Sequence, residues 1–254
     1  MMCLVLKRGG MSELTNNNEK LWWAAAKGSE PLAKAALEQG ASWLAVPRLD
    51  CNDLWNALLP KHWANRSALA VALSSGACSL GEHELFKQGP DALAGSLIGE
   101  TLLMVACQAA NADWVERWAP QSKSLESRNS EGMTALAMSA VSASGRREKS
   151  FRCASALIAA GADLEARDKN GVTPIMWAIN SSDAQMVKLL ACAGADLQAG
   201  YMGWSVMDTA FAIGGEGVFD WLKGYEQSSN EKKELMLFES GQTQRVSAQR
   251  RTRI

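Results

Sequence analysis

Along this chain, short stretches with apolar residues three and four positions apart alternate with polar, glycine-containing turns. The clearest unit is 168–199, DKNGVTPIMWAINSSDAQMVKLLACAGADLQA. Its apolar positions fall on one face of each of two predicted helices: Ile175, Ala178 and Ile179 on the first, and Met186, Val187, Leu189 and Leu190 on the second. Neither short helix can bury its apolar face alone, so the pattern predicts that the unit stacks on copies of itself.

The residues at the ends of this unit have identifiable backbone roles. Gly171 allows the positive φ of a tight opening turn. Thr173 is placed to cap the first helix, and Pro174 occupies the first helical position, where a missing N–H costs nothing. Gly194 is expected to end the second helix in a left-handed conformation. The sequence therefore predicts a turn followed by an antiparallel helix pair.

Copies of the unit lie on both sides of it. Gly203 follows Gly171 by 32 positions, Gly132 precedes Gly171 by 39, and Gly99 precedes Gly132 by 33. Compared with the spacings of 32 and 33 residues, the repeat that begins at Gly132 carries roughly six extra residues. We assign them to 142–149, the polar stretch SASGRREK between its two predicted helices.

The pattern weakens toward the N-terminus. A first-helix pattern recurs at 67–72, a second helix is expected around Glu82 to Gln88, and 21–41 reads as a complete helix pair. About fifteen residues beyond the normal period separate that pair from Ser67. We expect an irregular excursion there, with a short helix over Asp53 to Leu59.

These repeats resemble the ankyrin-repeat family over roughly residues 20–223. The resemblance implies an all-α solenoid of about six stacked helix pairs, whose projecting turns and first helices line a concave face. It divides the chain into an N-terminal extension at 1–19, expected to be disordered, an ankyrin-repeat domain at 20–224, and a C-terminal short helix with a basic tail at 225–254. The resemblance is strong for residues 96–210 and weak for 43–95, so we expect the N-terminal part to be irregular there.

Composition argues against several classes of function. The net charge of −1 provides no global attraction for nucleic acid, and the apolar runs are far shorter than a membrane span. Six scattered cysteines without a CxxC pair, and only two histidines, predict no metal site and a reduced, cytoplasmic protein. No P-loop, GxSxG or dinucleotide-binding glycine pattern is present, so we expect neither an enzyme nor a cofactor.

Large side chains at the turn tips are the remaining candidates for function, because a repeat needs none there. The candidate partner-binding residues are Tyr201, Met202, Trp204, Lys169, Asn170 and Glu131. Aromatic groups and methionines are favoured at protein interfaces. The C-terminal segment could instead fold back over the last tip. Glu100 is also placed at a tip, whereas Met104, Met138, Met176 and Trp177 are expected to pack between neighbouring first helices.

The resemblance implies a non-enzymatic module that binds a protein through its turn tips and concave face. Two narrower hypotheses stay open. One is an inhibitor of a specific toxin enzyme, of the immunity or antitoxin type. The other is a secreted effector or adaptor that acts on host proteins. In each case we expect the free chain to be a monomer that binds a protein partner, and neither nucleic acid nor a membrane.

Overall fold

The computed structural model describes residues 16–46, 66–76, 79, 81–94, 99–141, 145–201, 203–213 and 217–228. The first helices of successive pairs are α2 (Asn17–Lys27), α5 (Ala68–Ser75), α7 (Leu102–Gln108), α9 (Ala135–Ala140), α11 (Pro174–Asn180) and α13 (Val206–Ile213). Their partners are α3 (Glu30–Glu38), α6 (Glu82–Gln88), α8 (Ala112–Trp118), α10 (Arg147–Ala159), α12 (Ala184–Ala193) and the helix at 218–228. The 3-10 helix η4 (Ala119–Gln121) extends α8.

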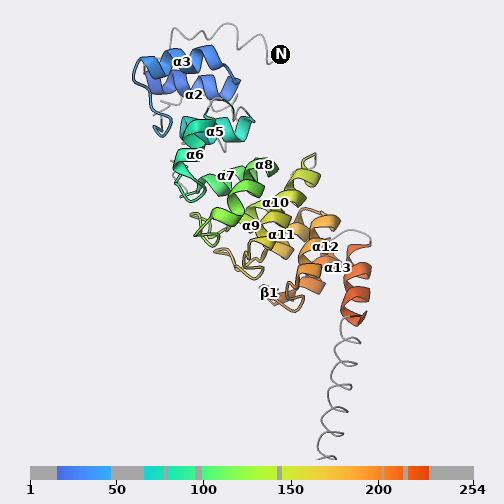
Figure 1. Ribbon diagram of the computed structural model, residues 1–254. Helices are drawn as coiled ribbons and strands as arrows, with labels where there is room; N and C mark the ends of the chain where they lie inside the picture. Colours follow the sequence, from blue (N-terminus) through green and yellow to red (C-terminus); the bar gives the residue numbers. More distant parts are fainter. Residues whose placement is uncertain are drawn as a thin grey trace, which may run out of the picture.

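The helix pairs stack into one curved, elongated array that runs from α2 to α13 (Figure 1). First helices pack on first helices, α2 on α5, α7 on α9 and α11 on α13, while α10 packs between α8 and α12. Strands β1 (Gly200–Tyr201) and β2 (Trp204–Ser205) form one short antiparallel hairpin, with Tyr201 opposite Trp204. The all-α solenoid is thus confirmed. The number of repeats, about six, stays a prediction, because residues 47–65 lie outside the described part.

Hydroxyl groups begin several first helices, as the pattern predicts. The Oγ atoms of Ser67, Thr101 and Thr134 accept hydrogen bonds from the amides of Ala70, Met104 and Ala137 at 3.3, 3.2 and 3.4 Å. The same expectation is wrong for Thr173, whose Oγ1 is buried with no hydrogen-bond partner among the described residues. At the start of α11 the first helical position is occupied by Pro174, which has no N–H that needs a partner.

Small and unbranched apolar side chains fill the space between the first helices. Ala178 and Ala210 are almost fully buried, which allows α11 and α13 to approach each other closely. Three methionines of the first helices are also buried: Met104, Met138 and Met176. Trp177 is half-buried against the same core. Most of these four side chains therefore pack between helices and are not exposed at a binding surface.

Some sequence-based expectations fall at or beyond the edges of the described residues. Helix α2 begins at Asn17, within the stretch assigned to the N-terminal extension, and the last described helix passes residue 224 to reach 228. The expected helix over Asp53 to Leu59 and the basic tail after 228 lie outside the described residues. No helix in the described part of the chain is long and apolar enough to span a membrane.

Candidate functional site

An apolar groove lies between α11 and α13, beside the β1–β2 hairpin. It has a volume of about 350 Å³ and is lined by Val172, Met176, Asn180, Trp204, Thr209, Ala212 and Ile213. Trp204 and Ile213, two of the lining residues, are 54% and 52% exposed. The groove therefore offers apolar surface that nothing in the described part of the chain covers.

Trp204 is held by hydrogen bonds on both sides of it. Its strand pairs with β1, and the next residue, Ser205, forms a reciprocal cap with Asp208 at the start of α13. The Ser205 amide and hydroxyl each donate to Asp208 Oδ2 at 2.8 Å, and these bonds lower the pKa of the Asp208 carboxyl. The backbone that carries Trp204 is thus fixed at the rim of the groove.

The turn before α11 is organised by one carboxylate. Asp168 Oδ1 accepts hydrogen bonds from the amides of Asn170 and Val172 at 2.8 and 2.9 Å, and its Oδ2 accepts one from Trp177 Nε1 at 3.1 Å. Asn129 plays the same part in the preceding turn, where its Oδ1 accepts from the amides two and four positions later. Each turn tip is therefore closed on itself and projects as a compact loop.

Arginine side chains then join one turn tip to the next. Arg167 Nη1 donates to the carbonyl oxygen of Gly171 in its own turn at 3.2 Å, and to that of Gly200 in the next at 2.7 Å. Arg128 makes the equivalent pair of bonds one repeat earlier, to Gly132 and to the Arg167 carbonyl. In the same place, the Lys169 amide donates to the Glu131 carbonyl at 2.9 Å. The three tips form one continuous edge of the solenoid (Figure 1).

The predicted site residues are distributed along this edge. Lys169, Asn170 and Glu131 are all exposed on neighbouring tips, and Trp204 lies at the groove. The backbone of Tyr201 forms β1 opposite Trp204, and Met202 lies outside the described residues. Whether these residues bind a partner stays a prediction.

Sequence reasoning did not find the groove itself. Thr209 and Ile213, four positions apart on α13, form one wall, and Met176 of α11 contributes to the lining although it is buried. The spacing of Thr209 and Ile213 on one helix face was visible in the sequence. No later first helix follows α13 in the described part of the chain, so no such helix covers this face there.

Glu100 does not occupy the exposed position that the pattern gave it. Its side chain is fully buried, and its Oε2 accepts bonds from Arg66 Nε at 2.9 Å and Nη2 at 2.5 Å. Arg66 is itself 1% exposed and also donates to Gln108. The expectation failed because the partner that draws Glu100 inward lies 34 residues earlier in the sequence.

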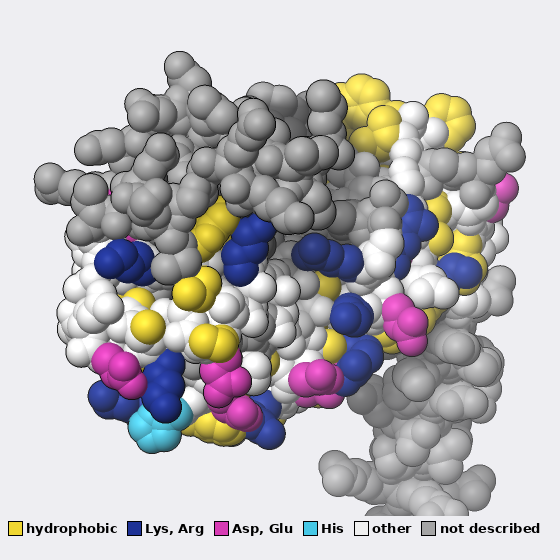
Figure 2. Space-filling model, turned by 90° about the horizontal axis from the view of Figure 1, so that it is seen from above, with side chains coloured by type: hydrophobic (Ala, Val, Ile, Leu, Met, Phe, Trp, Pro, Cys, Tyr) yellow, Lys and Arg dark blue, Asp and Glu magenta, His cyan; other side chains and the backbone are white. Residues whose placement is uncertain are grey.

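The described surface carries both signs of charge. Figure 2 shows Lys and Arg side chains across the middle of one face, with most of the visible Asp and Glu side chains below them. Within the described residues, no group of three or more His, Cys, Asp or Glu side chains is arranged to hold a metal ion. The apolar groove and the polar turn tips beside it therefore form the candidate partner-binding site.

Comparison with protein families identifies the repeats of this chain as well. A family model described as ankyrin repeats (3 copies) matches residues 103–201 and 145–233, which together cover just over half of the chain. A comparison with curated proteins gives no match. Ankyrin repeats generally act as protein–protein interaction modules and are typically non-enzymatic. The turns and stacked helix pairs of this chain, together with this match, show that the chain belongs to the ankyrin-repeat family.

Proposed function

We propose that this chain is a non-enzymatic binding module that holds a protein partner in the groove between α11 and α13 and against the neighbouring turn tips. The half-exposed Trp204 at the groove is the observation that carries the proposal. Tryptophan is among the residues that contribute most to protein interfaces, and such residues act from well-packed pockets. No cofactor or nucleic acid is part of this function.

The chemistry of the groove defines what it would accept. Its apolar lining, from Met176, Trp204 and Ile213, suits a large apolar side chain of the partner, and a volume of about 350 Å³ accommodates one. Asn180 adds a side-chain amide for hydrogen bonds to the partner's backbone, and the Thr209 hydroxyl, which donates to the Ser205 carbonyl at 2.9 Å, can accept one. We therefore expect a partner segment with one apolar anchor flanked by polar residues.

The tips beside the groove favour binding for an energetic reason. Because the bonds from Arg128 and Arg167 already join the tips, Glu131, Lys169 and Asn170 lose little backbone freedom when a partner docks. Their side chains carry one negative charge, one positive charge and one amide. They thus contribute selectivity for a polar partner surface more than affinity.

Site-specific photo-crosslinking tests this proposal. A photoreactive phenylalanine analogue at position 204 should crosslink to one partner, and the same analogue at Phe211 should not. Phe211 is 76% exposed on α13, the helix that follows the strand of Trp204, but does not line the groove, so it is a nearby control. Purified partner should then bind the wild type and Phe211→Ala equally, and Trp204→Ala more weakly. Equal crosslinking from both positions would reject the site.

Two versions of this function differ in the number of partners. An inhibitor of the immunity or antitoxin type should form one tight, stoichiometric complex and block the activity of the enzyme it binds. An effector or adaptor should hold several partners more weakly.

We place the chain in the cytoplasm, as a monomer before it binds its partner. Thiols stay reduced in that compartment, including that of the exposed, unpaired Cys192.

A further inference from the structure

One repeat carries an addition that the solenoid does not need. The stretch 142–149, which we assigned to the connection between the helices of the Gly132 repeat, is not wholly a connection, because α10 already begins at Arg147. Helix α10 has 13 residues, whereas α8 has 7 and α12 has 10. The start of α10 carries three basic residues, Arg146, Arg147 and Lys149, with Glu148 between the last two. Stacking requires none of these charges, since all three side chains are exposed.

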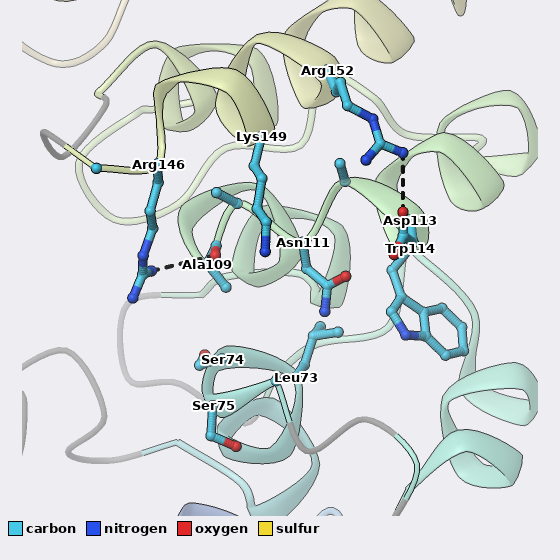
Figure 3. Close-up of a pocket in the computed structure, with 14 residues that line it drawn as sticks. Leu73, Ser74, Ser75, Ala109, Asn111, Asp113, Trp114, Arg146, Lys149 and Arg152 are labelled. Carbon is cyan, nitrogen blue, oxygen red and sulfur yellow. Dashed lines mark hydrogen bonds and ion pairs between the residues drawn. The ribbon is translucent and has the colours of Figure 1, made fainter.

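The lengthened helix forms one wall of a polar cavity of about 490 Å³. The other walls are the end of α5 and the turn between α7 and α8, so three successive repeats contribute. In Figure 3, Arg146 and Lys149 extend from the start of α10 toward that turn, and Asn111 lies between them and α5. This cavity shares no lining residue with the apolar groove.

The charges in the cavity are divided between its two ends. At one end Arg152 pairs with Asp113 at 3.0 Å and with Glu116 at 2.8 Å, which uses its charge within the protein. At the other end Arg146 makes one hydrogen bond, from Nη1 to the carbonyl oxygen of Ala109 at 3.3 Å. Lys149 Nζ forms no hydrogen bond or ion pair with any described residue. Two positive charges therefore line the cavity without a carboxylate partner among the residues that the structure describes.

We propose that this cavity is a second binding site, which takes a phosphate monoester group. Arg146 and Lys149 give its lining two positive charges that no described carboxylate pairs with, and a phosphate monoester carries about −1.5 to −2 at neutral pH. The guanidinium of Arg146 offers donors for two phosphate oxygens, and Lys149 adds a point charge. Its bond to Ala109 holds Arg146 at the cavity wall, so binding orders little that is not already ordered.

The phosphate could belong to a free small molecule or to a phosphorylated side chain of a protein partner. Both share the chemistry that Arg146 and Lys149 recognise. The site does not depend on the apolar groove, so it could operate whether or not a partner is anchored at Trp204. A protein partner that used both sites would have to reach from the turn edge to the opposite ends of the first helices.

A titration followed by two-dimensional amide NMR at low ionic strength tests the site. The probes are inorganic phosphate, a phosphoserine peptide, and N-acetylglutamate as a carboxylate control, with potassium chloride matched for ionic strength. The expected result is saturable shifts at amides 109–113 and 145–149 with either phosphate probe. Tighter binding of the peptide would point to a protein source, and tighter binding of free phosphate to a small molecule; both support the site.

Variants make the result specific. The double substitution Arg146→Gln and Lys149→Gln should weaken phosphate binding at least tenfold. Arg147→Gln, which removes the same charge from the same helix outside the cavity, should leave binding unchanged. Trp204→Ala should also leave it unchanged, which separates this site from the groove. Equal binding by the double variant, or binding of N-acetylglutamate as tight as phosphate, would overturn the proposal.

Discussion

Arg167 donates a hydrogen bond from Nη1 to the carbonyl oxygen of Gly200 at 2.7 Å, and so ties the turn before α11 to the hairpin that carries Trp204. The same nitrogen bonds Gly171 in its own turn at 3.2 Å. One side chain thus spans two repeats. The position of Trp204 relative to α11, and with it the shape of the groove, depends on this bridge.

Removal of the bridge should loosen the hairpin without unfolding the solenoid. In Arg167→Gln we expect the Val206 amide, which donates to Ala199 beside the hairpin, to exchange its hydrogen about fivefold faster. That change corresponds to a net hydrogen-bond contribution of about 1 kcal/mol. Arg128→Gln is the matched control, because it removes the same bridge one repeat earlier and should leave exchange at Val206 unchanged. Equal exchange in both variants would show that Arg167 does not position the hairpin.

The buried pair of Arg66 and Glu100 should be costly to break on one side only. Glu100→Val leaves the Arg66 guanidinium buried without its carboxylate, and we expect a loss of about 3–5 kcal/mol in the free energy of unfolding. The double variant Arg66→Met, Glu100→Val should lose much less, since neither charge remains. Urea denaturation measures both. A single variant no less stable than the double would contradict this account of the pair.

Contact between successive turns limits the residue at position 132. Gly132 has φ of 78°, and a Cβ there would lie 2.7 Å from the Lys169 amide nitrogen. Gly132→Ala should therefore destabilise the protein by about 1–3 kcal/mol more than Gly161→Ala. Gly161 has a similar φ of 90°, but a Cβ there would meet no described atom within 4 Å. Thermal melting of both variants separates the destabilisation caused by steric contact from that caused by the positive φ alone. Equal losses of stability in the two variants would count against tight contact between the tips.

The described cysteines should differ strongly in reactivity. Burial raises the pKa of the Cys153 thiol to about 12 and that of Cys107 well above its usual value, whereas Cys192 is exposed. At pH 8 only about one Cys153 in ten thousand is then a thiolate, the form that reacts with alkylating agents. Iodoacetamide should modify Cys192 first, and Cys107 and Cys153 only after denaturant is added, as read by peptide mass spectrometry. Early labelling of Cys153 would contradict the buried packing of α10.

Much of the fold could be predicted because the same pattern of turn residues and apolar positions recurs along the chain. The left-handed glycine expected at the end of the second helix, Gly194, has φ of 105°, and the weakly patterned helix at Glu82 to Gln88 forms as expected. These features depend on residues close in sequence. The same locality explains why turn tips and first helices could be assigned by their offsets.

The remaining features depend on contacts between repeats. Nothing near Glu100 in the sequence indicates that Arg66 would draw it inward, and nothing near Arg167 indicates a bond to Gly200. The groove depends on a further relationship, because Thr209 and Ile213 line it where α13 meets α11. Sequence pattern identified Trp204 as a candidate but could not show which neighbours would form a concave surface with it.

The central claim is that Trp204 serves binding and contributes little to folding. The most direct test measures partner affinity and melting temperature together for Trp204→Ala. We predict that affinity falls by about 2 kcal/mol, roughly 30-fold, while the melting temperature falls far less than it would for a buried tryptophan, because half of the side chain is exposed. A variant with full affinity and a clearly lower melting temperature would show that Trp204 belongs to the core, and would contradict the proposed site.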